Sequence, residues 1–167
     1  MQPPAALTAA HQVEKFDCGH PVMNAWLVQR ALKNQDEGAT RSFVVCDDTG
    51  RVLGYYALAV GSCARENAPG NISRGMPEPI PMVILARLAV DRTLQRSGLG
   101  RQLIADAVLR TLRIAEQAGV RGLMVSAIDK AAAEYYERLG FVRAKRSEDV
   151  LMLRLKVAQE VLGTGMR

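Results

Sequence analysis

A short turn rich in glycine and arginine follows the most apolar part of the chain. The run PMVILARLAV ends at Val90, and Gln95-Arg96-Ser97-Gly98-Leu99-Gly100-Arg101 comes soon after it, at the start of an amphipathic stretch. A strand that passes through such a turn into a helix leaves the first backbone N–H groups of the helix without intrahelical partners. These donors and the positive end of the helix dipole attract phosphate, and glycine lets a phosphate approach the backbone. The turn therefore predicts a pyrophosphate site, although an ordinary glycine-rich helix start has the same spacing.

The rest of the sequence predicts a mixed α/β fold that positions this turn. Apolar spacing indicates the helices and strands, Asp48-Thr49-Gly50 indicates a hairpin, and four prolines and three glycines over 61–81 indicate a loop that is a lid or locally disordered. The expected order is a helix over 20–38, a hairpin over 42–60, the loop over 61–81, a strand over 82–90, a helix over 98–118, a strand over 121–128, a helix over 130–139, and strands over 141–146 and 151–157. We expect one sheet with helices on its faces, in a single domain over residues 1–167.

Composition narrows the class of protein. Of the 167 residues 49% are hydrophobic, and the net charge of +5 is weak evidence for a polyanionic partner. No apolar run approaches the roughly 20 residues that cross a bilayer, and the N-terminal residues lack the pattern of a secretory signal, so we expect a cytoplasmic protein without a membrane partner. Three cysteines without a C-x-x-C pair indicate reduced thiols, and no metal site is expected.

Two motifs in this order resemble the GNAT N-acetyltransferases. The family signature Gln/Arg-x-x-Gly-x-Gly/Ala is matched at Gln95 to Gly100, and YYERLGF, Tyr135 to Phe141, matches a second family feature. The resemblance covers about Glu14 to Lys156. It implies a GNAT-like mixed sheet flanked by helices, with strands 4 and 5 splayed to admit acetyl-CoA as cosubstrate. The backbone of Leu88, Ala89 and Val90 would bind the pantetheine arm, with the pyrophosphate over Gln95 to Arg101; these three residues also fit a plain core strand.

Longer segments resemble the GNAT toxins of bacterial type II toxin-antitoxin modules. These segments are FDCGHPVMNAWLVQRALKNQ, GYYALAV and ILARLAVDRTLQRSGLG. The resemblance implies acetylation of the α-amino group of aminoacyl-tRNA, which stops translation. It also implies a ribbon-helix-helix antitoxin as partner, which brings operator DNA to the complex, and leaves a homodimer open. Ser126 stands where many relatives have histidine, which puts a role for that histidine in doubt.

The same resemblance makes Tyr136 the candidate general acid, because it directly precedes E-x-x-G-F. A tyrosine hydroxyl, with a pKa of about 10, can protonate a departing thiolate near neutral pH. The alternative is that Tyr135 and Tyr136 both only pack. No acidic residue lies between Pro81 and Val90, so a lysine amine, with a pKa of about 10.4, would lack a base there, whereas an α-amine near 8 is already partly neutral. An α-amine acceptor fits better.

Several basic residues fall in segments expected around the cleft, where they would face tRNA, although solvated surface residues or ligands of the CoA phosphates would give the same pattern. They are Arg30, Lys33, Arg41, Arg65, Arg74, Arg87, Arg92 and Arg96. Trp26 fits the core better than a platform for base stacking. Two other functions stay open: a GNAT enzyme that acts on a protein N-terminus or a small-molecule amine, and a CoA-binding module without catalysis.

Overall fold

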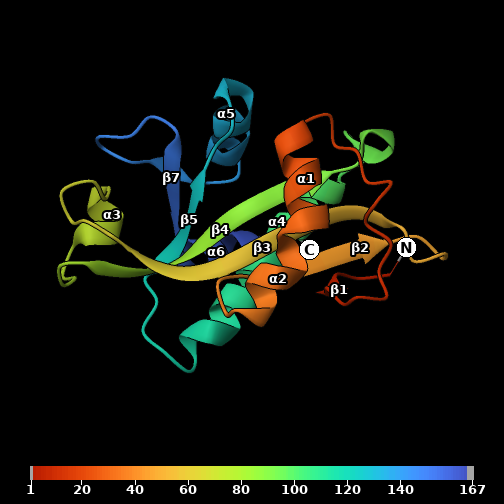
Figure 1. The fold of residues 1–167 in the computed structure, drawn as a ribbon. Helices are drawn as coiled ribbons and strands as arrows, with labels where there is room; N and C mark the ends of the chain where they lie inside the picture. The colour runs from red at the N-terminus through yellow and green to blue at the C-terminus, as the bar shows by residue number, and fades with distance from the viewer. Residues whose placement is uncertain (1, 165–167) are drawn as a thin grey trace. The chain divides into compact units, whose positions relative to one another are not determined.

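The computed structural model describes residues 2–164 and forms one sheet in the order β1-β2-β3-β4-β5-β7-β6 (Figure 1). The strands are β1 (Ala5–Ala6), β2 (Arg41–Cys46), β3 (Val52–Cys63), β4 (Ile80–Val90), β5 (Gly122–Ser126), β6 (Val142–Arg143) and β7 (Val150–Arg154). The helices are α1 (Pro21–Gln29), α2 (Ala31–Asp36), α3 (Gly70–Ser73), α4 (Leu99–Ala115), α5 (Lys130–Arg138) and α6 (Leu155–Thr164), with a 3₁₀ turn η1 (Arg92–Leu94). The predicted mixed α/β class is confirmed.

The chain forms two compact units, and each is assembled from two separate stretches of sequence. The first unit comprises Met1–Ala59 and Ala86–Ala107, and the second comprises Val60–Leu85 and Val108–Arg167. The elements β3, β4 and α4 each begin in one unit and end in the other. A single domain over residues 1–167 stays a prediction, and each unit is described by itself below.

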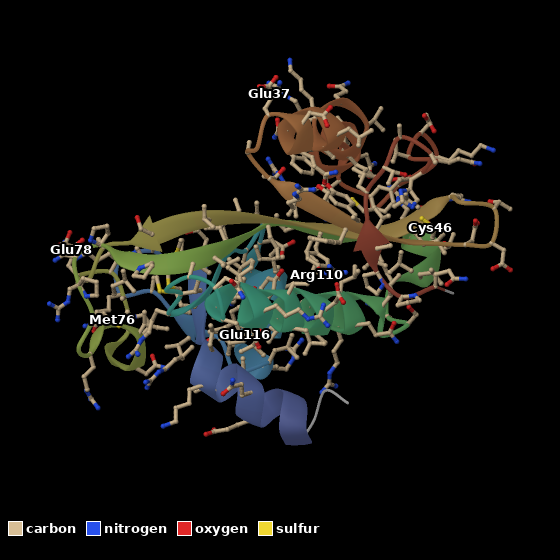
Figure 2. The ribbon with its side chains drawn as sticks, turned by 90° about the horizontal axis from the view of Figure 1, so that it is seen from below. Glu37, Cys46, Met76, Glu78, Arg110 and Glu116 are labelled. Carbon is tan, nitrogen blue, oxygen red and sulfur yellow. The ribbon has the colours of Figure 1, made fainter. Side chains whose placement is uncertain are left out.

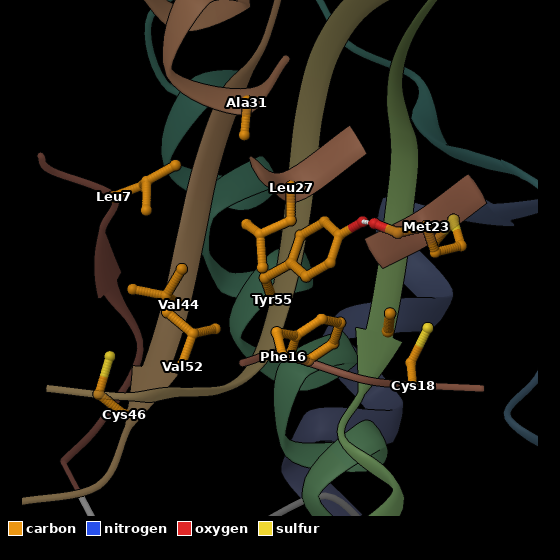
Figure 3. Packing of buried hydrophobic residues seen from close by; sticks show 11 residues of the cluster. Leu7, Phe16, Cys18, Met23, Leu27, Ala31, Val44, Cys46, Val52 and Tyr55 are labelled. Carbon is orange, nitrogen blue, oxygen red and sulfur yellow. Dashed lines mark hydrogen bonds between the residues drawn. The ribbon is translucent and has the colours of Figure 1, made fainter. Parts of the chain in front are cut away.

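The core of the first unit is built around Tyr55 on β3. Its ring is fully buried, meets Phe16 edge-on with centroids 5.4 Å apart, and lies parallel to Trp26 at 5.9 Å. The Tyr55 hydroxyl donates a hydrogen bond to the carbonyl oxygen of Met23 at 2.8 Å, which attaches α1 to the sheet (Figure 3). Aliphatic side chains complete the cluster, among them Leu27 of α1. The expectation that Trp26 belongs to the core fits this stack.

The helix expected over 20–38 is wrong as a single element, because the structure has two helices. Arg30 separates α1 from α2, and its φ of −123° lies outside the helical region. The Arg30 N–H closes α1 on the carbonyl of Trp26 at 2.8 Å, while its own carbonyl accepts from Asn34 at 2.7 Å and opens α2. Apolar spacing continues through the break, with Leu27 and Ala31 both buried, so the sequence pattern did not reveal it.

The second unit contains the parallel pair of the sheet. Met82–Leu85 of β4 pair with Gly122–Val125 of β5, and β5 continues antiparallel against β7. The described parallel ladder ends at Leu85, although β4 runs on to Val90. A parallel pair requires a crossover connection, which α4 supplies between β4 and β5.

The connection between β3 and β4 is ordered and shorter than the loop predicted over 61–81. It runs over 64–79 and contains α3. The Arg121 guanidinium fixes it by donating to the backbone carbonyls of Ile72 at 2.9 Å, Asn71 at 3.2 Å and Arg74 at 3.1 Å. Ile72 is fully buried. Figure 2 shows Met76 and Glu78 in the last part of this connection.

The C-terminal elements differ from the prediction in two places. The strand expected over 141–146 covers only Val142–Arg143, and the strand expected over 151–157 ends at Arg154, where α6 begins. Leu155 and Ala158 are buried three residues apart, which is helical spacing. The short run LMLRLKV fits both the two-residue period of a strand and the 3.6-residue period of a helix. Tertiary contacts therefore decided where the strand ends and the helix begins. The two-residue strand β1 was not predicted, because two alanines carry no strand pattern.

Candidate active site

In the first unit, the turn between β4 and α4 is organised by one buried carboxylate. Asp91 is 2% exposed and caps η1 by accepting hydrogen bonds from the backbone N–H of Thr93 at 3.1 Å and from its hydroxyl at 2.8 Å. It also accepts from the Asp17 N–H at 3.1 Å and pairs with Arg51 at 3.4 Å. Burial opposes the charge, but these hydrogen bonds outweigh it and lower the pKa of Asp91. Asp91 therefore joins three separate segments at the base of the turn.

Two of the predicted cofactor residues use their side chains in hydrogen bonds to backbone groups of the protein itself. The Gln95 amide donates to the carbonyls of Cys18 at 2.9 Å and Val90 at 3.0 Å. The Ser97 hydroxyl donates to the carbonyl of Leu94 and accepts from the N–H of Leu99 at 3.4 Å. These contacts show Gln95 and Ser97 holding the turn in shape, so any contact with a cofactor is a proposal for their backbone.

The backbone of the turn has a shape that suits an anion. Arg96 has a φ of +65°, and Gly98 has a φ of +92°, so two left-handed residues stand just before α4. The turn leads directly into α4, where the first backbone N–H groups of a helix lack intrahelical partners and can bind an anion. A Cβ built on Gly98 meets no atom within 4 Å, so there is open space beside the turn. The exposed side chains of Arg96 and Arg101 add positive charge.

Leu88, Ala89 and Val90 form the end of β4 that leads into this turn. Ala89 is buried at 7% exposure, and the other two are half-buried. Gly54 of β3 lies opposite; a Cβ there would be 3.1 Å from Leu103 and 3.2 Å from Leu99, so its absence lets α4 pack close to β3. The strand end is therefore packed as core, which does not conflict with a role for its backbone.

In the second unit, Tyr136 lies on the inward face of α5. Asp129 caps this helix by accepting from the Ala132 N–H at 2.8 Å, and Ala133 and Tyr136, three residues apart, are its buried positions. The Tyr136 ring is 6% exposed and meets the Phe141 ring edge-on at 5.2 Å. Helical phase therefore turns Tyr136 inward and leaves Tyr135 half-buried.

The Tyr136 hydroxyl is not used by the part of the chain that the structure describes. None of the described hydrogen bonds involves it, and it is absent from the buried polar atoms that lack a partner, Thr40 Oγ1, Ser42 Oγ and Arg51 Nε. Burial raises the pKa of Tyr136, with a smaller effect from Tyr135 in the same direction. A buried ring therefore presents a hydroxyl that stays protonated and is available to a ligand.

Most of the other residues singled out from the sequence are exposed. Ser126 ends β5 and is exposed. Of the eight basic residues singled out from the sequence, seven are exposed and only Arg87, on β4, is half-buried. Among the described residues no cluster of three or more His, Cys, Asp or Glu could hold a metal ion, and none of the described helices is long and apolar enough to span a membrane.

Sequence reasoning missed the supporting residues of the turn. No role was predicted for Asp91, although an aspartate two residues before a threonine is a recognisable capping pattern. The contribution of Asp17 and Arg51 had no local signal, because they lie 74 and 40 residues from Asp91 in the chain.

Comparison with known proteins agrees with this geometry. Residues 39–143 match the acetyltransferase (GNAT) domain family. A tRNA-acetylating toxin of Mycobacterium tuberculosis (strain ATCC 25618 / H37Rv) is 41% identical over 160 residues, which are 96% of each chain. The chain therefore belongs to the GNAT acetyltransferase family, and the predicted family is confirmed.

Two solved structures share the fold over almost the whole chain. AtaT complexed with acetyl-methionyl-tRNAfMet is 30% identical with a TM-score of 0.88, covering 96% of this chain and 98% of AtaT. A tyrosine-to-phenylalanine mutant of the AtaT toxin, bound to the C-terminus of the antitoxin AtaR and to acetyl-CoA, is 30% identical with a TM-score of 0.82, covering 96% and 97%.

Proposed function

We propose that this chain is an acetyl-CoA-dependent N-acetyltransferase that acetylates the α-amino group of aminoacyl-tRNA and acts as a translation-inhibiting toxin of a type II toxin-antitoxin system. The observation that carries the proposal is the 41% identity to a tRNA-acetylating toxin over 96% of both chains. The likeness to AtaT in complex with acetyl-methionyl-tRNAfMet supports the same class of acceptor.

Acetyl-CoA supplies the activated acetyl group as a thioester. The turn from Gln95 to Arg101 is suited to its pyrophosphate, because it lies at the start of α4, where helix N–H groups lack intrahelical partners, and two exposed arginines add charge. The backbone of Leu88, Ala89 and Val90 is assigned to the pantetheine arm, which would bond to it as an added strand does. No side-chain chemistry is needed at these three positions.

Tyr136 is assigned the role of general acid. When the amine nitrogen bonds to the acetyl carbon, the carbon–sulfur bond breaks and its electron pair leaves on sulfur. The Tyr136 hydroxyl donates its proton to that thiolate, the amine loses a proton to solvent, and the resulting tyrosinate takes up a proton from solvent, which restores the tyrosine. The hydroxyl is available for this role because none of the described hydrogen bonds involves it.

The acceptor amine needs little help to become nucleophilic. β4 carries no acidic side chain from Ile80 to Val90. An α-amine has a pKa of about 8, and esterification of the adjacent carboxyl lowers it further, so a useful fraction is neutral at physiological pH. A lysine amine, at about 10.4, would remain almost fully charged.

The partners follow from the same class of toxin. We assign a ribbon-helix-helix antitoxin that neutralises the enzyme and brings operator DNA to the complex, since AtaT has been solved with its antitoxin AtaR and with DNA. Charged tRNA as the proposed substrate supports an activity in the cytoplasm.

The proposed function is tested by the fate of a labelled acetyl group. The protein is incubated with labelled acetyl-CoA and either charged tRNA, uncharged tRNA or a lysine-containing peptide with a blocked N-terminus. We expect label only with charged tRNA, released together with the amino acid when the ester is cleaved by mild alkali. Label on the peptide, or equal label on uncharged tRNA, would show that the acceptor class is wrong.

A further inference from the structure

Arg87 differs from the other basic residues in being half-buried against an aromatic ring. It lies on β4 directly before Leu88, and its guanidinium carbon is 5.4 Å from the centroid of the Trp26 ring. Its Nη1 atom is 3.8 Å from the Met23 sulfur. Trp26 is itself held parallel to the buried ring of Tyr55. The position of the guanidinium is therefore fixed by a stack of packed side chains within the first unit.

The charge of Arg87 is not neutralised by the described part of the chain. The described ion pairs join Arg51, Arg92, Lys130, Arg143 and Arg146 to carboxylates, and none includes Arg87. Methionine sulfur is a weak acceptor, and an aromatic face leaves the N–H donors in the guanidinium plane unused. A half-buried cation in this state binds an anion more strongly than an exposed one does.

The position of Arg87 along β4 separates it from the pyrophosphate turn. The turn follows Val90, whereas Arg87 precedes Val90 by three residues. Three residues span roughly 10 Å along a strand. A pantetheine arm that runs from the turn along Val90 to Leu88 ends with its thioester toward Arg87. Arg87 is therefore placed at the acceptor end of the reaction.

We propose that Arg87 binds the phosphodiester that joins the last two nucleotides of aminoacyl-tRNA. The inference rests on the proposed function and names a binding residue for its acceptor. In an aminoacyl-tRNA the carboxyl group is esterified and neutral, so this phosphodiester is the anion nearest to the reacting amine. A guanidinium matches it with two parallel N–H donors. The contact orients the esterified end of the tRNA toward the thioester.

The test removes the proposed ion pair in two ways, by neutralising the phosphodiester of the tRNA and by replacing Arg87. One charged tRNA is natural, and a second carries a neutral methylphosphonate at its last internucleotide linkage. For the unmodified protein we expect kcat/KM to fall about 10- to 100-fold on the neutral linkage, mainly through KM. Arg87→Met replaces the guanidinium by an apolar side chain that can still pack on Trp26. On natural tRNA its kcat/KM should be about 10- to 100-fold below that of the unmodified protein. The neutral linkage should lower the kcat/KM of this variant little further. Arg87→Lys, which keeps the charge but not the fork, should fall between.

Controls separate binding from a structural effect. Lys15→Met removes an exposed positive charge of the same unit and should leave the preference for the natural linkage unchanged. Acetyl-CoA should raise the melting temperature of Arg87→Met as it does that of the unmodified protein. Equal activity of the unmodified protein on both tRNAs, or a full preference in Arg87→Met, would overturn the inference and leave the proposed function standing. Acetylation of neither tRNA, with activity on another amine, would overturn both.

Discussion

Tyr55 in the first unit and Tyr136 in the second are both buried tyrosines, yet they use their hydroxyl groups differently. The Tyr55 hydroxyl donates to the Met23 carbonyl at 2.8 Å and is part of the packing between β3 and α1. The Tyr136 hydroxyl takes part in none of the described hydrogen bonds, while its ring packs on Phe141. Burial raises the pKa of both. The difference shows that burial alone does not distinguish the two tyrosines, whereas the use of the hydroxyl in the described hydrogen bonds does.

The largest expected effect comes from removing these two hydroxyls in turn. Tyr136→Phe should slow acetyl transfer by roughly 10² to 10⁴ and abolish growth arrest, because a general acid is lost. Its stability should hardly change, because no described hydrogen bond is lost. Tyr55→Phe should cost about 1 kcal/mol of stability and leave the rate of the folded enzyme close to normal. Steady-state kinetics and urea unfolding measure both.

Tyr135→Phe is the matched control for helical phase. Tyr135 is half-buried, so this variant should keep most of its activity. Full activity in Tyr136→Phe, or loss of activity in Tyr135→Phe alone, would show that the wrong tyrosine has been assigned.

The second prediction compares two left-handed glycines of the first unit. Gly98 has a φ of +92° and Gly50 a φ of +89°, and a Cβ on either meets nothing within 4 Å. Glutamate at either position therefore carries a similar backbone penalty, but only Gly98→Glu places a carboxylate beside the pyrophosphate turn. We expect acetyl-CoA to raise the melting temperature of Gly50→Glu and not that of Gly98→Glu. Gly100→Glu should also lose the shift.

An unchanged shift in Gly98→Glu and Gly100→Glu would remove the pyrophosphate assignment. Loss of the shift in Gly50→Glu as well would trace the effect to folding instead of ligand binding. The measurement is a thermal melt with and without acetyl-CoA.

The smallest effect concerns Asp91. Like Tyr55, it is a buried polar group whose side chain is used in hydrogen bonds within the protein. Its pKa is lower in the folded protein than its ordinary value of 3.8, so ionised Asp91 stabilises the fold above that value. The stabilisation is lost as the pH falls through the lowered pKa of the folded state. Asp91→Asn should be less stable by about 1 to 3 kcal/mol at pH 7, and the gap should narrow below roughly pH 4. A gap that is independent of pH would contradict this role.

Local signals in the sequence were sufficient to predict the elements that carry the candidate site. The apolar run before Asp91, the glycines of the turn and the stripe that follows predicted β4 and α4, with α4 beginning within one residue of the expected position. The family motifs singled out Tyr136, and helical spacing required that only one of the two adjacent tyrosines point inward. These features are local because caps, turns and periodicity depend on near neighbours in the chain.

Only the tertiary structure decided how those elements are held and what their side chains do. The break at Arg30, the change from strand to helix at Leu155 and the ordering of 64–79 by Arg121 all depend on contacts with distant residues. The hydrogen bonds made by the side chains of Gln95 and Ser97 also depend on the tertiary structure. The same is true of the capping network of Asp91 and of the position of Arg87 over Trp26. A sequence pattern reports the period of a segment and the types of its residues; which hydroxyl or charge is left for a ligand depends on every group that packs against it.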